Sequence, residues 1–121
     1  MDADYKMTNA EYRLSDIIWS SEPVNSPELC RLCEEKLGWK RTTTYTVLKK
    51  LCERGIMRNE AAVVTSIIPR EQAQRYESRA VMEKAFGGSL PMFVAAFLSG
   101  KTLSDEEAKQ LKALIERHRE G

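Results

Sequence analysis

The stretch that decides the fold runs from Trp39 to Gly55 and reads WKRTTTYTVLKKLCERG. We expect a helix that begins near Arg41 or Thr42 and ends at the glycine. A rotation of about 100° per residue places four side chains on one face of that helix: Thr44, Val47, Leu48 and Leu51. The pattern therefore predicts a helix with one buried face and an opposite face that points outward.

The predicted outward face combines hydroxyl groups with charges: Thr42, Thr46, Lys49 and Glu53, flanked by Thr43 and Lys50. Threonine can bind a phosphate or a base edge, and lysine neutralises phosphate. From Lys36 to Arg58 the chain has seven basic residues and one acidic residue, although the whole chain has a net charge of only +1. A basic block in an otherwise acidic chain is typical of a polyanion-binding surface, with a solvated polar face as the alternative. The candidate DNA-binding residues are Lys40, Arg41, Thr42, Thr43, Thr46, Lys49, Lys50, Arg54 and Arg58.

Two short helices are predicted before this one. Thr8-Asn9-Ala10-Glu11 has the form of a capping box, and apolar residues at helical spacing follow it, so the first helix is expected from Asn9 to Ser20. Ser26 is the expected N-cap of the second helix, with Pro27 at its first position and Gly38 at its end.

A small two-stranded β hairpin is predicted after Gly55. The segments 56–59 and 63–68 are short, the second is rich in β-branched residues, and only Glu60-Ala61-Ala62 separates them. The fold class is therefore mainly α with a small two-stranded β hairpin: a winged helix-turn-helix. We expect a flexible extension over residues 1–7 and the winged-helix DNA-binding domain over residues 8–69.

The last third of the chain has the composition of an interaction region. We expect a connecting helix within residues 70–88, ending at Gly87-Gly88, and dimerisation helices within residues 89–121. The first of these helices is apolar all round, and Ser104-Asp105-Glu106-Glu107 is a capping box that opens the second. Packing of this tail on the winged helix is the alternative to a dimer. The candidate dimerisation residues are Leu90, Phe93, Val94, Phe97, Leu98, Leu111, Leu114 and Ile115.

Composition excludes several classes of protein. The chain has 121 residues, of which 42% are hydrophobic and 31% charged, as in a globular domain. The longest apolar run, Leu90 to Leu98, is about half of what a membrane helix needs, and the polar start lacks the pattern of a secretory signal. A cytoplasmic protein with no membrane partner is the expectation. A single histidine and the lack of a phosphate-binding loop predict no enzyme and no cofactor.

The three cysteines are Cys30, Cys33 and Cys52. Cys30-Arg31-Leu32-Cys33 is a lone C-x-x-C, whereas zinc sites need four ligands. Because Cys33 and Cys52 share helix faces with leucines, we interpret them as buried small hydrophobes and predict no metal site.

The residues so far resemble the penicillinase repressor family, which includes the β-lactamase, methicillin-resistance and copper-responsive repressors. The resemblance rests on segments 14–19, 38–51 and 53–56, and on Phe86-Gly87-Gly88-Ser89-Leu90, and it extends over nearly all of residues 7–116. It implies a homodimeric transcriptional repressor that binds a palindromic operator, a double-stranded DNA, through two winged helices held together by C-terminal helices.

The sequence departs from that family in three places. The wing has Glu60-Ala61-Ala62-Val63 where the family carries a Gly-Arg tip, so we expect fewer phosphate contacts by the wing. In the β-lactam-responsive members a protease cuts an Asn-Phe bond, and the matching bond here is Ala96-Phe97. The Cys-x-Cys tail of the copper-responsive members is missing.

Three hypotheses therefore remain. The first is a repressor that a regulatory protease can release by cutting at Ala96-Phe97. The second is a winged-helix protein-interaction module, which a weakened wing would suit. The third is a thiol- or metal-responsive regulator.

Overall fold

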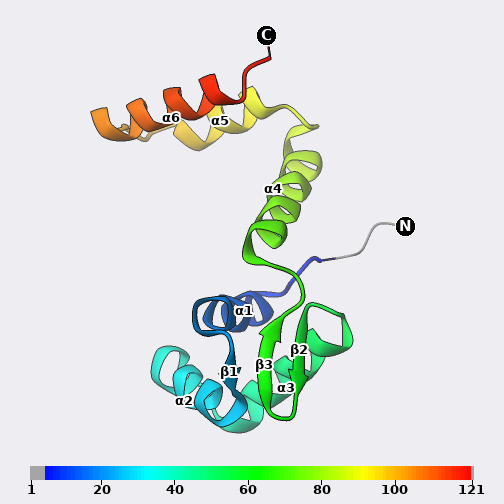
Figure 1. Ribbon diagram of the computed structural model, residues 1–121. Helices are drawn as coiled ribbons and strands as arrows, with labels where there is room; N and C mark the ends of the chain where they lie inside the picture. Colours follow the sequence, from blue (N-terminus) through cyan, green and yellow to red (C-terminus); the bar gives the residue numbers. More distant parts are fainter. Residues whose placement is uncertain (1–4, 121) are drawn as a thin grey trace. The chain divides into compact units, whose positions relative to one another are not determined.

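The computed structural model describes residues 5–120 and contains a mostly helical chain with one small sheet. The elements, labelled in Figure 1, are α1 (Asn9–Ser21), β1 (Val24–Asn25), α2 (Ser26–Leu37), α3 (Arg41–Glu53), β2 (Met57–Glu60), β3 (Val63–Ser66), α4 (Arg70–Phe86), α5 (Leu90–Leu98) and α6 (Asp105–Arg117). The chain divides into two compact units, with the boundary after Ala80, inside α4. The winged helix-turn-helix is thus confirmed, and it lies in the first unit.

The sheet has three antiparallel strands in the order β1-β3-β2. β2 and β3 form the expected hairpin, with Asn59 opposite Val64 and Glu60 opposite Val63. The third strand, β1, was not predicted. Its two residues pair with the same two valines of β3, and a strand of two residues is too short to produce an alternating pattern.

The first helix begins as the sequence predicts, and the second begins one residue earlier. Thr8 and Glu11 form the complete capping box of α1. The N-cap of α2 is Asn25, whose side chain accepts a hydrogen bond from the Glu28 N–H at 2.9 Å, so the expectation of Ser26 was wrong. Asparagine and serine are both good N-caps, and the preceding strand decides between them by holding Asn25 in extended conformation.

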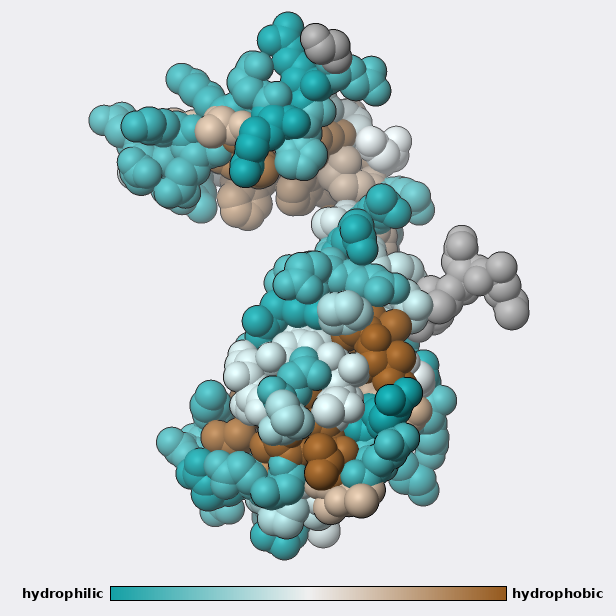
Figure 2. Space-filling view, viewed as in Figure 1, coloured by the Kyte–Doolittle hydropathy of each residue, from teal (hydrophilic) through white to brown (hydrophobic). Residues whose placement is uncertain are grey.

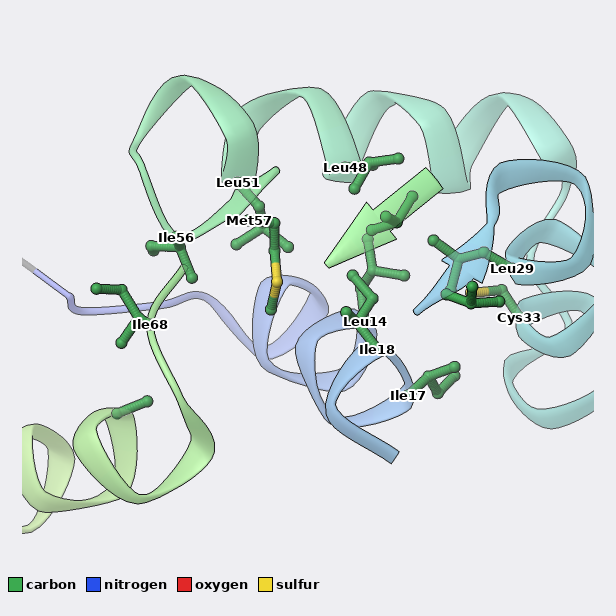
Figure 3. Packing of buried hydrophobic residues seen from close by; sticks show 13 residues of the cluster. Leu14, Ile17, Ile18, Leu29, Cys33, Leu48, Leu51, Ile56, Met57 and Ile68 are labelled. Atoms are coloured by element: carbon green, nitrogen blue, oxygen red, sulfur yellow. The ribbon is translucent and has the colours of Figure 1, made fainter. Parts of the chain in front are cut away.

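The core of the first unit lies where α1, α2, α3 and the sheet meet (Figure 3). Helix α1 contributes Leu14 and Ile18, and α2 contributes Leu29 and Cys33, all of them inaccessible to solvent. Each fully buried leucine or isoleucine stabilises the fold by about 1.5–3 kcal/mol relative to an exposed one. Helix α3 adds Leu48 and Leu51, and the hairpin region adds Ile56, Met57 and Val64.

The start of α4 is fastened to this domain by polar contacts. The indole N–H of Trp19 donates to the Ile68 carbonyl at 3.0 Å. Arg70 lies over the Trp19 ring at 5.6 Å and pairs with Asp16 at 2.8 Å. Trp19 therefore anchors the start of α4 to α1.

The N-terminal segment also packs on the first unit. Tyr5 and Met7 contact the core, and the Tyr5 ring meets the Tyr76 ring edge to face at 5.8 Å. Residues 5–7 of the expected flexible extension are therefore in contact with the domain, because their large side chains find apolar surface beside α1 and α4. Residues 1–4 of that extension lie outside the described residues.

The second unit has no buried side chain in α5 or α6. Ser89 caps α5, and Ser104 with Glu107 forms the predicted capping box of α6. Phe93 contacts Phe86 at 5.4 Å and Phe97 at 6.2 Å between ring centres. No single helix among the described residues is long and apolar enough to cross a membrane; α4 and α5 meet that requirement only when counted together as a broken pair.

The tip of the hairpin carries an unusual turn. Ala61 and Ala62 both have positive φ, 51° and 64°. Two positive φ values in a two-residue hairpin loop define a type I′ turn, which favours Asn-Gly because a Cβ atom is strained there.

We predict that replacing Ala61-Ala62 with Asn-Gly stabilises the first unit by about 1 kcal/mol. Thermal unfolding should show a midpoint raised by several degrees. The matched control is Ala10→Gly in α1, where φ is helical and glycine should not raise the midpoint. A lower midpoint for the Asn-Gly variant would contradict the assignment of the turn.

Candidate nucleic-acid interface

Helix α3 presents two distinct faces. Thr44, Leu48 and Leu51 are at most 2% exposed and pack toward α1 and α2, while Val47 is half-buried. The predicted inward face is therefore the one that the structure buries. This packing fixes the rotation of the helix about its axis, and so decides which residues point outward.

The outward face of α3 is exposed and carries the predicted hydroxyl and basic groups, Thr42, Thr43, Thr46, Lys49 and Lys50. The Thr46 hydroxyl donates to the Thr42 carbonyl at 2.9 Å, which leaves its lone pairs available as acceptors. Lys49 lies 4.0 Å from Glu53, and an exposed pair at that distance is weak. Both lysines can therefore turn toward an anion at little cost.

The N-terminal end of α3 adds positive potential to this face. Lys40 is the N-cap residue, no side chain caps the helix, and Arg41 is its exposed first residue. The N–H groups of the first helical turn carry the positive end of the helix dipole. An anionic group is favoured at this end by the dipole and by both side chains.

Arg54 has a different environment from the other predicted residues. Its Nη1 atom lies 3.0 Å and 2.9 Å from the two carboxylate oxygens of Glu11. It is also hydrogen-bonded to the Lys6 carbonyl. Only 28% of the Arg54 side chain is exposed, compared with 79% for Lys49. Its charge is therefore matched within the protein.

The wing is poor in positive charge. Arg58 lies on β2, is exposed, and is 3.5 Å from Glu60 on the same strand. The Ala62 carbonyl accepts a hydrogen bond from the Ser26 N–H at 2.8 Å, which ties the wing tip to the start of α2. Arg58 is the basic side chain that the hairpin offers to a phosphate.

Sequence reasoning missed Tyr45. It lies on α3 with 38% of its surface exposed, and its hydroxyl group is 3.4 Å from the Ser26 hydroxyl. Its place on the helix, beside Thr42 and Thr46, was the available signal, since about 100° per residue puts it close to the outward face. It brings an aromatic ring to a surface otherwise made of threonine and lysine.

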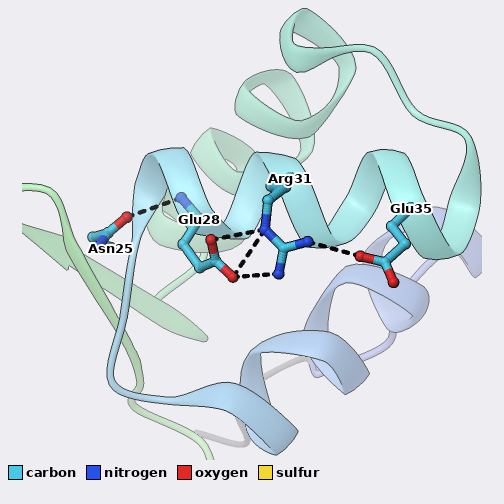
Figure 4. Close-up of polar contacts among 4 residues, drawn as sticks. All are labelled: Asn25, Glu28, Arg31 and Glu35. Carbon is cyan, nitrogen blue, oxygen red and sulfur yellow. Dashed lines mark hydrogen bonds and ion pairs between the residues drawn. The ribbon is translucent and has the colours of Figure 1, made fainter.

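Helix α2 differs from α3 in its charge. Arg31 is held by Glu28 at 2.6 Å and by Glu35 at 2.8 Å (Figure 4). The hydrogen bond from Arg31 lowers the pKa of Glu28 and so favours its charged form. Because two carboxylates surround Arg31, the exposed side of α2 is not a favourable surface for a polyanion.

The cysteines are placed as small hydrophobic residues. Cys33 belongs to the core, Cys30 is buried and Cys52 is half-buried. Burial raises the pKa of the Cys33 and Cys52 thiols, which disfavours the reactive thiolate. Among residues 5–120 no three potential metal ligands lie close enough together to hold an ion.

The candidate dimerisation residues form a solvent-facing apolar surface. Leu90 and Phe97 of α5 are each 60% exposed, and Ile115 of α6 is 63% exposed. Figure 2 shows apolar side chains gathered on one side of this unit beside hydrophilic ones. A groove between the two helices is lined by the rest of the predicted set, Phe93, Val94, Leu98, Leu111 and Leu114. Ala96, beside Phe97 in the candidate cleavage bond, is exposed as well.

The chain is similar to known proteins along most of its length. The family model described as penicillinase repressor matches residues 7–117. The penicillinase repressor of Bacillus licheniformis is 24% identical over 118 residues, covering 94% of this chain and 92% of the relative. The methicillin resistance regulatory protein MecI of Staphylococcus epidermidis is 19% identical over 115 residues, covering 92% of this chain and 94% of the relative.

A solved structure has the same fold. It is the solution structure of the monomeric form of BlaI from Bacillus licheniformis in complex with the blaP half-operator. The two share 21% identity with a TM-score of 0.50, over 59% of this chain and 90% of that chain. The fold and the exposed basic face of α3 define a winged-helix protein of the DNA-binding class. The chain belongs to the penicillinase repressor family, a family of transcriptional repressors and not of enzymes.

Proposed function

We propose that this protein is a sequence-specific transcriptional repressor that inserts α3 into the major groove of its operator. The observation that carries the proposal is the exposed face of α3, where Thr42, Thr43 and Thr46 lie beside Lys49 and Lys50. Hydroxyl groups can read base edges, and lysines neutralise the flanking phosphates. The complex of BlaI with the blaP half-operator supports the same use of the fold here.

Changing Lys49 and Lys50 together to Ala should weaken binding to every duplex. If both lysines contact phosphates, the plot of log affinity against log salt becomes shallower by about two units. Changing Thr43 or Thr46 to Ala should instead alter the sequence preference. The measurement is fluorescence anisotropy over a salt series, with duplexes selected from a random pool.

The matched control for this experiment is the pair Lys109 and Lys112, which lie exposed on α6. Changing both to Ala removes the same charge and should leave the slope unchanged. A wild-type protein that binds no duplex at low ionic strength would refute the proposal.

We further propose a homodimer formed through α5 and α6, bound to a palindromic operator. Leu90, Met92 and Phe97 are each at least 60% exposed in α5, although its residues are almost all apolar. Such a surface is costly to leave in water and is the usual mark of an interface. Two linked heads then bind two half-sites, since the first contact raises the effective concentration of the second head.

Truncation after Gly87 should yield a folded monomer that binds a single half-site weakly. The first unit, which ends at Ala80, keeps its core in this variant. Analytical ultracentrifugation should find a dimer for the full chain and a monomer for the truncated one. A full chain that sediments as a monomer at about tens of micromolar contradicts the dimer.

Release of the repressor by a regulatory protease is the remaining part of the proposal. A cut at Ala96-Phe97 would divide α5 and remove the shared apolar surface, while the winged helix stays intact. Affinity would fall through loss of bivalency. Mass spectrometry of protein from induced cells should find fragments ending at Ala96. Derepression with the chain intact there would contradict release by cleavage.

A further inference from the structure

The ion pair between Glu11 and Arg54 joins two elements that are far apart in sequence. Arg54 directly follows α3 as its C-cap, and Glu11 lies in the first turn of α1. The Glu11 side chain is only 7% exposed, and both of its oxygens lie within 3.0 Å of Arg54 Nη1. Removing Arg54 would leave the nearly buried Glu11 carboxylate without its counter-ion.

The same carboxylate holds the start of α1. Glu11 Oε1 accepts a hydrogen bond from the Thr8 N–H at 2.9 Å, while the Glu11 N–H donates to the Thr8 hydroxyl at 3.1 Å. Arg54 in turn donates to the Lys6 carbonyl. The end of α3, the start of α1 and the N-terminal segment therefore meet at one ion pair.

Charge at this junction is stable near neutral pH. Burial raises the pKa of the Glu11 carboxyl. The hydrogen bonds from Thr8 and the hydrogen bond and positive charge of Arg54 lower this pKa by a larger amount, so the net shift is downward. Glu11 thus stays ionised, and Arg54 remains bound to it.

We propose that Glu11 and Arg54 are a positioning pair for the DNA-reading helix, and that Arg54 is not itself a phosphate contact. The inference rests on the proposed function. Apolar packing of the inward face fixes the rotation of α3 about its axis, whereas the ion pair fixes one end of the helix at a defined place against α1. A small shift of α3 would misplace the hydroxyl groups that read bases, since such sites tolerate errors of only about 0.5 Å.

The test compares Glu11→Gln, Arg54→Met and the double variant in the full chain, with Lys49→Met as the matched control. Binding is measured over a salt series for the duplex that the wild type selects and for a scrambled duplex. Each single variant should lower the affinity ratio of selected to scrambled duplex by about three- to tenfold, with the salt slope unchanged. The double variant should be no worse than either single one, and Lys49→Met should reduce the slope by about one unit.

The sign of the Glu11→Gln effect separates positioning from simple charge. Removing a negative charge alone would strengthen binding to any duplex, whereas loss of positioning weakens binding to the selected one. A lower amount of folded protein would weaken both duplexes equally and leave their ratio unchanged. Circular dichroism identifies the folded variants, and Glu11→Gln alone carries the test if Arg54→Met does not fold.

Two results would overturn this inference alone: an Arg54→Met slope reduced like that of Lys49→Met, or a Glu11→Gln ratio equal to that of the wild type. A wild-type chain that binds no duplex would instead reject the proposed function, and this inference with it.

Discussion

Burial of one face of α3 is the constraint on which the rest of the structure depends. Leu48 and Leu51 fill the space between α1, α2 and the sheet, and no rotation of the helix keeps them there while burying Thr42, Thr43 and Thr46. A core packed to native density admits one rotation. The exposed face of α3 is therefore set by residues that never touch a partner.

The two units differ in how completely they bury their apolar side chains. The first has a complete core and holds α3 in place, whereas α5 and α6 have no buried residue and leave Phe97 and Ile115 largely in solvent. Stability of the second unit is thus tied to whatever covers that surface. In the proposed homodimer, the partner that covers it would also set the distance between the two copies of α3, and assembly would then be coupled to recognition of paired sites.

The starts of α1 and α6 and the span of α4 were predictable because they depend on local chemistry. The capping boxes at Thr8 and Ser104 and the span of α4 follow from neighbouring residues. Two features that were missed, strand β1 and the Glu11–Arg54 ion pair, depend on distant contacts. Strand β1 exists because β3 lies beside it, and Arg54 reads as one more basic residue until the fold brings it to Glu11, 43 positions away. Neither pairing leaves a periodic signal in the sequence.

The most direct test of the central claim is an NMR titration of the labelled protein with a duplex that it selects from a random pool. The account predicts amide shift changes concentrated in α3, over residues 41–50, with smaller changes at Arg58. In α6 it predicts no changes that depend on the base sequence of the duplex. Changes confined to α5 and α6, or an α3 that is unaffected by saturating duplex, would contradict it.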